Sequence, residues 1–533
     1  MNQPTSTEAL IQGATRNTIG DALERIVQTC PDRPALAFQS RSWSYLALNR
    51  AVNRVANRLL AAGLVKGDRV AAYGKNSDAY LILWLACTRA GLIHVPVNFS
   101  LTRRELTYVL QQSGAAAVFF DGVLEAQLEA ACDRQSLRVL GSLHGDAADL
   151  DVLAMAGAGV DDEGNDEGDD EAPAVDLSDI DVVQILYTSG TTSDPKGAMH
   201  THRSLMAEYT SCLHHLDIEA GDRSLAALPL YHSAQMHVFA MPSLLVGAFS
   251  RVLDTPTPEI ILRLLKDERL NSFFAPPTVW ISLLRHEQFV EAELQHLQKL
   301  YYGASIMPEP IVRELAERLP ASGLYNCYGQ SEIAPLATVL RPEEHRERPA
   351  SCGRPVIHVM TRIVNPATGE DCGLGEQGEL VHRSPQLMVG YWDKPEETAE
   401  AFAGGWFHSG DLGYRDEQGF IWIVDRIKDI VNTGGVLVAS RDVEEVLYTH
   451  PDVDEVAVIG VPDAKWIEAI AAIVVLRPGV ETDADALIEH ARGHLAPFKV
   501  PKSVHFVTEL PKNTSGKLLK RALRDQYAGS QQP

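Results

Sequence analysis

The sequence predicts an α/β protein, with a large N-terminal domain built on largely parallel sheets and a smaller α/β domain at the C-terminal end. Two observations lead to this prediction. Apolar segments of strand length alternate with amphipathic segments of helix length over residues 18–327, and such alternation is typical of parallel sheets covered by helices. A second, compact run of the same kind starts after Asp425, which indicates a further domain.

The elements of the first part of the chain follow from apolar spacing. Residues 18–30 carry Ile19, Leu23 and Val27 on one helical face, and later segments repeat this periodicity. Continuous short apolar runs between them predict buried strands. We expect helices at 18–30, 45–62, 78–90 and 105–113, and strands at 35–38, 42–45, 69–73, 93–96 and 116–120.

The rest of the chain contains three further kinds of segment. The acidic stretch Asp161–Glu171 is low in complexity and predicts a disordered surface loop. After Gly353, short β segments with glycine turns continue to a boundary near Arg426, so we expect domains of residues 1–425 and 426–533. We expect helices at 204–216, 260–268, 277–285, 442–450 and 483–491, and strands at 182–186, 224–229, 272–275, 300–303, 324–327, 453–461 and 469–476.

Composition narrows the functional classes. The chain has 533 residues, 45% of them hydrophobic, and a net charge of −24 from 47 basic and 71 acidic residues. So acidic a surface repels nucleic acid and anionic lipid. The seven cysteines are scattered and form no Cys-x-x-Cys pair, which favours reduced thiols and a cytoplasmic location. The N-terminus lacks the pattern of a signal peptide, and the longest apolar runs, such as 80–86, are too short to span a bilayer.

A stretch of small and hydroxylated residues follows the expected strand 182–186. Short side chains leave backbone N–H groups free to converge on one centre, the hydroxyls add donors, and a lysine adds positive charge. These features are typical of a loop that binds polyphosphate. A Walker A loop is not indicated, because Lys196 precedes Gly197 and no Gly-Lys-Ser/Thr ending is present. The residues concerned are Thr188, Ser189, Gly190, Thr191, Thr192 and Lys196.

Four more segments occur in a fixed order with this loop: Tyr325–Glu332, Trp406–Gly413, Asp425–Asp429 and Leu510–Leu518. Together the five segments resemble the motifs of the acyl-adenylate-forming enzymes, which include acyl-CoA synthetases, luciferases and the adenylation domains of peptide synthetases. The resemblance extends from about Trp43 to Arg524.

Three places depart from the pattern of these enzymes. Ser193 stands where the loop usually has Gly, and Ser331 replaces Thr and keeps its hydroxyl. Val436 and Leu437 replace a polar pair after Gly434 and Gly435.

The resemblance implies roles for individual residues. Catalytic roles fall on Lys517, Glu332, His232 and Lys196, and Glu332 is also the expected Mg²⁺ ligand, because a hard cation prefers carboxylate and phosphate oxygens. Lys428 is the expected hinge of a mobile C-terminal domain, and Gly434 and Gly435 the expected contacts to coenzyme A. The ATP and AMP site is expected to comprise Thr188, Ser189, Gly190, Thr191, Thr192, Gly303, Ala304, Ser305, Asn326, Tyr328, Gly329, Gln330, Ser331, Asp411 and Arg426.

A second set of residues is expected to line the acyl pocket. No arginine or lysine stands among them to pair a second carboxylate, which favours a mainly apolar monocarboxylic acid. A medium- or long-chain fatty acid is our first expectation, and an aryl acid such as a benzoate or cinnamate is the alternative. The set is Tyr231, His232, Gln235, Trp280, Gly303 and Cys327.

The resemblance thus implies an ATP-dependent acid–CoA ligase. The acid would be activated as acyl-AMP with release of pyrophosphate, and the small domain would then rotate to allow formation of acyl-CoA. ATP, Mg²⁺ and coenzyme A are the expected cofactors, and the sequence leaves a homodimer open.

Three alternatives share these motifs: an adenylation enzyme that loads a carrier protein, a luciferase-like oxygenase, and a non-catalytic binding protein. Loss of Lys517, Asp411 or Glu332 would favour the last of these, and all three residues are present.

Overall fold

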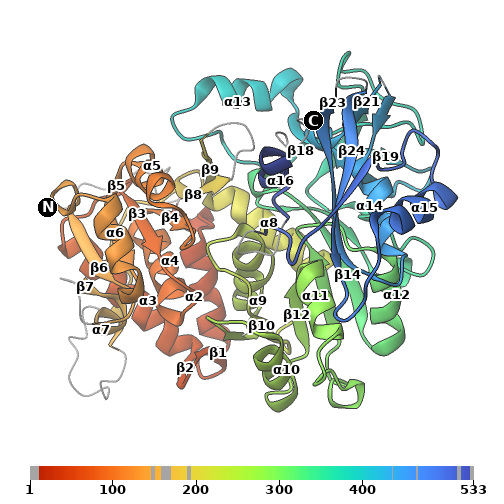
Figure 1. Cartoon of the computed structure of the whole chain (residues 1–533). Coiled ribbons are helices and arrows are strands. Elements are labelled where there is room, and N and C mark those ends of the chain that lie inside the picture. Colours follow the sequence, from red (N-terminus) through yellow and green to blue (C-terminus); the bar gives the residue numbers. More distant parts are fainter. Residues whose placement is uncertain are drawn as a thin grey trace, which may run out of the picture.

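The structure is a computed structural model that describes residues 11, 13–145, 150–157, 170–188, 194–434, 436–463, 466–512 and 518–527. The described residues form four sheets with helices packed on them (Figure 1). The acidic segment for which we predict disorder lies almost entirely outside the described residues, since residues 161–169 are not among them.

The N-terminal sheet has seven strands, and helices cover both of its faces. Neighbouring strands are parallel except for the last pair, β8 and β9. Helices α3 (Tyr45–Ala61), α4 (Asp78–Ala90) and α7 (Val152–Ala156) pack on one face, and α5 (Arg103–Ser113) and α6 (Glu125–Ala131) on the other. The strand order is β7 (Leu150–Asp151), β6 (Val139–Ser142), β5 (Ala115–Phe120), β3 (Arg69–Tyr73), β4 (Ile93–Val97), β8 (Val182–Thr188) and β9 (Lys196–Thr201).

A second large sheet has nine strands. Its central strands are parallel, and antiparallel pairs close both ends. Helices α10 (Pro258–Asp267), α11 (Pro277–Leu284) and α12 (Glu309–Arg318) cover one face. The strand order is β16 (Arg354–Pro355), β15 (Leu336–Leu340), β14 (Gly323–Gly329), β13 (Lys299–Gly303), β12 (Ser272–Ala275), β10 (Arg223–Ala226), β11 (Phe249–Val252), β1 (Pro34–Phe38) and β2 (Arg41–Ser44).

Three helical segments lie between the two large sheets (Figure 1). Helix α8 (His202–His215) and the π-helical segment η4 (Ala234–Ala240) contribute side chains to the hydrophobic cores on both sides. Helix α9 (Met241–Val246) continues from η4, and α2 (Ile19–Thr29) packs against α3, α4 and α9. Because π-helical turns occur frequently at functional sites, η4 draws attention to the loop that precedes it.

The remaining chain forms two smaller sheets. Strands β17 (Met360–Val364), β18 (Gly378–Arg383), β19 (Phe407–Arg415) and β20 (Ile421–Arg426) make an antiparallel meander, with α13 (Pro395–Ala401) between β18 and β19. A short 3₁₀ turn, η9 (Ile427–Asp429), then leads into a five-stranded sheet. Its strands are β21 (Val431–Thr433), β22 (Val436–Val438), β23 (Val453–Asp463), β24 (Ile467–Leu476) and β25 (Ser503–Phe506).

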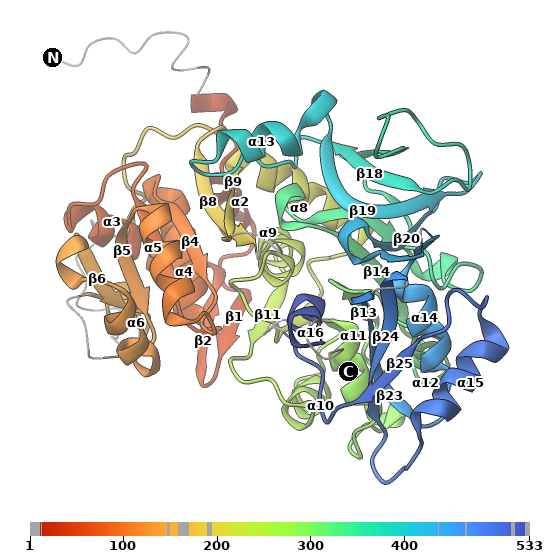
Figure 2. The same ribbon diagram turned by 45° about the horizontal axis from the view of Figure 1, so that its top comes forward.

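Helices cover both faces of this last sheet. Helices α14 (Ser440–Tyr448) and α15 (Ala484–His494) pack on one face and α16 (Lys520–Tyr527) on the other. Figure 2 shows these blue elements beside the green strands of the nine-stranded sheet.

The α/β fold class predicted from the sequence is confirmed, and the local chemistry explains where elements begin. Helix α5 starts two residues before its expected bound, because Thr102 and Glu105 form a capping box at its N-terminus. Helix α8 likewise starts at His202, because the Thr201 side chain accepts a hydrogen bond from the Ser204 amide. The antiparallel strands β15 and β16 and the segment η4 have no counterpart in our expectation.

Within the part of the chain that the structure describes, no helix combines the length and the apolar character needed to cross a bilayer. This finding agrees with the short apolar runs of the sequence.

Two buried histidines make the stability of the fold sensitive to acid. His94 and His202 are both 0% exposed, and burial lowers their pKa values to about 3 and about 4. The His94 ring contacts the Gln184 amide at 3.1 Å, and Nδ1 of His202 accepts a hydrogen bond from the backbone amide of Ile19 at 3.3 Å. Both rings are therefore neutral in the folded protein at neutral pH.

We predict that the free energy of unfolding falls as the pH is lowered from about 6.5 towards about 4. Each folded-state pKa lies below the unfolded value, so the unfolded chain binds more protons in this window and stability is lost as pH falls. His202→Asn should flatten the dependence by about 1.4 kcal/mol per pH unit. Urea unfolding between pH 5 and 7.5 measures this, with His214→Asn, an exposed position on the same helix, as the control. Identical slopes for the two variants would contradict the prediction.

Candidate active site

The phosphate-loop segment is a hairpin held against a second stretch of chain. Thr188 ends β8 and pairs with Lys196, the first residue of β9. The backbone amide of Trp392 donates to the Gly197 carbonyl at 2.7 Å, and that of Met199 donates to the Gly390 carbonyl at 3.0 Å. Strand β9 is therefore fixed relative to residues 388–392, and β8 is held through its pairing with β9. Four of the residues predicted for this loop, Ser189, Gly190, Thr191 and Thr192, lie outside the described residues.

Tyr391 joins two residues predicted to be catalytic. Its hydroxyl donates to Oε1 of Glu332 at 3.1 Å, and the Lys196 ammonium lies 5.2 Å from the centre of its ring. Burial, followed by the nearby Glu332 carboxylate, raises the pKa of the Tyr391 hydroxyl, which therefore stays a proton donor. An ammonium and a carboxylate thus lie on either side of one ring. Our sequence analysis missed Tyr391, because a single tyrosine after a glycine carries no recognisable pattern.

The residues predicted to bind the nucleotide gather at the carboxyl ends of β13 and β14. These strands are parallel neighbours, with Gly303 opposite Cys327. Ala304 has a φ of +63°, which turns the chain away from the end of β13 towards Ser305. Ligands of open α/β sheets bind at this edge.

The end of β14 turns sharply into the short 3₁₀ segment η6 (Ser331–Ile333). Gly329 leaves no room for a side chain, because a Cβ there would lie 1.7 Å from the Pro335 carbonyl oxygen. Asn326 is also predicted to bind the nucleotide, but its side-chain amide donates to the Ser351 carbonyl at 2.9 Å.

A buried carboxylate connects β14 to the four-stranded sheet. Asp411 is 3% exposed, and its Oδ2 accepts hydrogen bonds from the Tyr328 hydroxyl at 2.8 Å and from the Gln330 amide at 2.7 Å. The guanidinium of Arg426, opposite Asp411 on β20, lies 3.2 Å from Oδ1. Four predicted residues from three separate segments therefore meet in one cluster.

Hydrogen bonds also join the turn that carries Ser331 and Glu332 to the loop before η4 and to β9. The hydroxyls of Ser233 and Ser331 are 2.9 Å apart, and Nε2 of His200 on β9 donates to the Ser331 carbonyl at 2.8 Å. His232 precedes Ser233, and its Nδ1 accepts from the Ala234 amide at 3.3 Å. The loop that carries His232 is therefore fixed beside the turn that carries Glu332.

The structure brings together only part of the predicted acyl pocket. Tyr231 and His232 lie in the loop before η4, and Gln235 lies in η4, where its Oε1 accepts from the Leu228 amide at 3.2 Å. Gly303 and Cys327 are neighbours on the sheet, and Cys327 belongs to the core on the face covered by η4.

Trp280 is not part of this group. It lies on α11, on the opposite face of the nine-stranded sheet, where its ring packs against Phe273 with centres 5.3 Å apart. Its indole N–H donates to the Tyr301 carbonyl at 3.1 Å. Trp280 is therefore a core residue and does not belong to the proposed acyl pocket.

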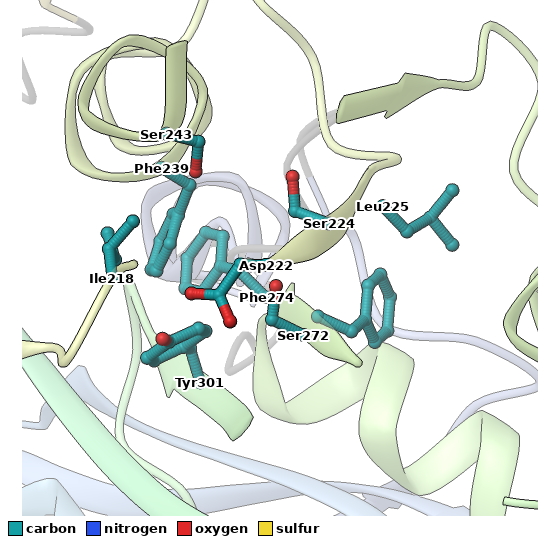
Figure 3. Close-up of a pocket in the computed structure, with 10 residues that line it drawn as sticks. Ile218, Asp222, Ser224, Leu225, Phe239, Ser243, Ser272, Phe274 and Tyr301 are labelled. Atoms are coloured by element: carbon teal, nitrogen blue, oxygen red, sulfur yellow. The ribbon is translucent and has the colours of Figure 1, made fainter. Parts of the chain in front are cut away.

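Figure 3 shows a small cavity on the face covered by η4. Asp222 and Ser272 place it at the amino ends of β10 and β12, away from Gly303 and Cys327 at the carboxyl ends. Its volume of about 10 Å³ suits a single water molecule. Aromatic rings line it: Phe239 stacks on Phe274 with ring centres 4.3 Å apart and lies tilted to Tyr301 at 4.9 Å. None of its lining residues belongs to the predicted acyl pocket.

Gly434, one of the two predicted contacts to coenzyme A, lies at one end of the five-stranded sheet. Gly434 has a φ of +64°, and its amide donates to the Trp466 carbonyl at 2.5 Å. Leu437 and Ile467 nearby are 70% and 60% exposed, so this end of the sheet is apolar and open to solvent. Gly435 and the predicted catalytic Lys517 lie outside the described residues.

The predicted hinge residue, Lys428, lies in η9 between the last two sheets. The residues on either side of η9 are held to the C-terminal part of the chain by hydrogen bonds and an ion pair. Oδ2 of Asp425 accepts from the amide and the hydroxyl of Ser440 at 2.8 and 2.5 Å, and Arg524 on α16 pairs with Asp429. Burial would raise the pKa of Asp429, but the hydrogen bond from Arg524 and nearby positive charges lower it.

Comparison with known proteins identifies the family. The sequence model of the AMP-binding enzymes matches residues 23–392, and that of the AMP-binding enzyme C-terminal domain matches residues 442–517. The chain belongs to the AMP-binding enzyme family. Curated relatives that match over most of their length are named as acyl-CoA synthases and ligases, and this AMP-binding enzyme is an AMP-forming acyl-CoA synthetase.

Curated relatives differ in the acid that their names give. A feruloyl-CoA synthase of Amycolatopsis is 36% identical over 505 residues, which are 94% of this chain and 98% of the relative. A long-chain fatty-acid–CoA ligase of Mycobacterium tuberculosis is 32% identical over 91% of this chain and 93% of its own length. Family membership therefore establishes ATP and coenzyme A as substrates of this AMP-binding enzyme but leaves its acid open.

The chain is also similar to solved structures of one enzyme in two states. ATP-bound MatB from Rhodopseudomonas palustris is 30% identical and gives a TM-score of 0.87 over 96% of this chain and 100% of that one. The apo form of the same protein gives 0.78 over 97% and 100%. The chain is therefore more similar overall to the ATP-bound form of MatB than to its apo form.

The residues present fit a magnesium ion bound together with a nucleotide. Among the described residues, no group of three or more His, Cys, Asp or Glu side chains could hold a metal by itself. Mg²⁺ commonly takes one or two carboxylates and completes its shell with phosphate oxygens and water. Glu332, a carboxylate beside the phosphate-loop hairpin, supplies that kind of ligand.

We predict that Asp411→Ala weakens ATP binding by on the order of 2 kcal/mol, about 30-fold, and leaves binding of the acid nearly unchanged. The substitution removes the acceptor at the centre of the cluster that Tyr328, Gln330 and Arg426 form. Calorimetry with ATP and with the acid measures both affinities. Glu417→Ala, an exposed change in the turn after β19, is the control. Unchanged ATP affinity would remove Asp411 from the nucleotide site.

Proposed function

We propose that this acyl-CoA synthetase activates a mainly apolar monocarboxylic acid as acyl-AMP and then transfers the acyl group to coenzyme A. The observation that carries the proposal is the convergence at the end of β14, where Tyr328 and Gln330 contact Asp411 and Glu332 lies in the next turn. A site with a ribose acceptor, a metal-binding carboxylate and a phosphate loop suits adenylation.

In the proposed first step, a carboxylate oxygen of the acid attacks the α-phosphorus of ATP and pyrophosphate leaves with the electron pair of the broken P–O bond. Mg²⁺, when bound, neutralises charge on the phosphates. Asp411 and Arg426 would hold the ribose, Tyr328 the adenine, and Lys196 the phosphates. Lys517 would stabilise the charge that builds on the α-phosphate in the transition state.

In the second step the sulfur of coenzyme A attacks the acyl carbon, its proton is released, and AMP leaves. We propose that the C-terminal domain rotates at Lys428 between the steps, so that Lys517 withdraws and Gly434 and Gly435 approach the thiol. The boundary proposed at residues 425 and 426 is supported by the end of β20 at Arg426. It is also supported by the two family matches, which end at 392 and begin at 442.

The kind of acid is proposed from the side chains that pack on the face of the nine-stranded sheet that carries Cys327. The fatty acid expected first would need a tunnel that continues past Gly303 and Cys327 along this face. Further along this face the rings of Phe239, Phe274 and Tyr301 pack together, and the cavity that they line, shown in Figure 3, has room for one water. This observation favours the aryl acid that the sequence left as the alternative, and His232 and Tyr231 would lie at its carboxyl end.

A panel of acids tests the proposal. We predict that pyrophosphate release is fastest with a benzoate or hydroxycinnamate, slower with octanoate and palmitate, and negligible with malonate. Thioester formation should require free coenzyme A. If palmitate is the best substrate, the proposal of an aryl acid is wrong and the proposed reaction still stands. Acyl transfer to the thiol of a carrier protein, with no thioester formed on free coenzyme A, would support a carrier-loading adenylation enzyme instead.

We predict that Lys517→Ala abolishes adenylation and largely spares thioester formation from supplied acyl-adenylate. The lysine acts only on the α-phosphate in this proposal, so the second half-reaction should keep its rate. Both half-reactions are measured on one preparation, with Lys512→Ala as the control, because Lys512 pairs with Glu455. Equal loss of both half-reactions would show that the proposed division of roles is wrong.

A further inference from the structure

Helix α8 carries a carboxylate in the interior between the two large sheets. Glu208 is 0% exposed, and so is Gln386, its neighbour from the segment after β18. Removing a carboxylate from water costs several kcal/mol unless hydrogen bonds compensate. The groups that compensate it therefore indicate what Glu208 holds in place.

Every partner of Glu208 is a donor. Its Oε1 accepts from the backbone amide of Leu336 at 3.0 Å and from the thiol of Cys212 at 3.3 Å. Its Oε2 accepts from the side-chain amide of Gln386 at 2.5 Å. The carboxylate therefore fixes one backbone N–H and the orientation of one amide group.

The orientation of Gln386 is set by further contacts. Its nitrogen also donates to the carbonyls of Leu336 at 2.9 Å and Ile333 at 3.3 Å, and its oxygen accepts from the Ser211 hydroxyl at 2.7 Å. A flipped amide would turn its oxygen towards two carbonyls, so only one orientation suits the site. Glu208 thus binds the N–H of Leu336, and Gln386 binds the carbonyls of Leu336 and Ile333.

The backbone that they bind is the turn that presents Glu332. Ile333 follows Glu332 directly, and Leu336 closes the same turn. Gln386 lies two residues before Met388, whose amide donates to the Glu332 carbonyl at 2.8 Å. It also precedes Tyr391, whose hydroxyl contacts the Glu332 carboxylate. Among the described residues, the hydrogen bonds of Glu208 go to Cys212, Leu336 and Gln386 and not to the Glu332 side chain, so Glu208 acts on Glu332 only through these groups.

We propose that Glu208 is a positioning residue which, through Gln386 and Leu336, holds the Glu332 carboxylate where it binds the magnesium ion of the nucleotide. The inference rests on the proposed function of Glu332 as the metal ligand. Outer partners of metal ligands commonly change metal affinity by about 10- to 100-fold when they are replaced. A purely structural Glu208 would change stability and leave metal affinity alone.

The test uses Glu208→Gln, which keeps the shape of the side chain and places an NH₂ group opposite that of Gln386. A non-hydrolysable ATP analogue is titrated into the full-length protein by calorimetry at a series of Mg²⁺ concentrations, without acid or coenzyme A. We expect the Mg²⁺ concentration for half-maximal tightening of analogue binding to rise about tenfold. Thermal unfolding of the same samples reports the loss of stability separately.

Asp222→Asn is the matched control. Asp222 is also a buried acid, 5% exposed, and it pairs with Lys299 at 2.7 Å at the amino end of β10, away from Glu332. We expect this variant to lose stability and to keep the Mg²⁺ dependence of the parent. An equal shift in both variants would show that the effect is general destabilisation and would overturn the inference.

Glu332→Gln separates the inference from its premise. If this variant keeps the Mg²⁺ dependence of the parent, the metal assignment fails and the inference falls with it. If Glu332→Gln loses the dependence and Glu208→Gln keeps it, the inference alone is overturned. Should Glu208→Gln fail to fold, Gln386→Met decides, because it removes the contacts to Ile333 and Leu336 and is expected to give the same tenfold shift.

Discussion

A carboxylate buried between packed sheets must find hydrogen-bond donors, and this constraint shapes the centre of the molecule. Glu208 meets it with donors from three segments, and Asp411 with donors from β14, the turn after it and β20. Each carboxylate can be satisfied only when those segments dock correctly. The two acids therefore tie the assembly of the fold to the assembly of the site, as expected for an acyl-CoA synthetase whose substrates meet between domains.

Much of the fold and part of the site could be predicted from the sequence. Helical periodicity and capping residues such as Thr102 mark local structure, and the motifs carrying Tyr328 and Asp411 meet although 83 residues separate them. Glu208 and Tyr391 could not be found, because an acid in a helix or a tyrosine in a loop acquires meaning only from distant partners. Trp280 was misplaced because α11 is apolar almost all round, so its sequence does not show which face it covers.

The connection at η9 links the two parts of the mechanism. It is short, it follows Arg426 of the nucleotide cluster directly, and ion-pair and hydrogen-bond contacts flank it at Asp425 and Asp429. The rotation that we propose there would therefore change the surroundings of the proposed ribose site and of the C-terminal domain at once.

The donors around Asp411 have a consequence for the enzyme between turnovers. With Tyr328, Gln330 and Arg426 in place, the carboxylate has three of its lone-pair directions occupied and is no bare anion that would collect stray cations. In the proposed function, an arriving ribose must displace some of these donors instead of filling an empty acceptor. Part of the hydrogen-bond energy that the ribose gains is then offset by the donors it displaces, which would help AMP to leave once the thioester has formed.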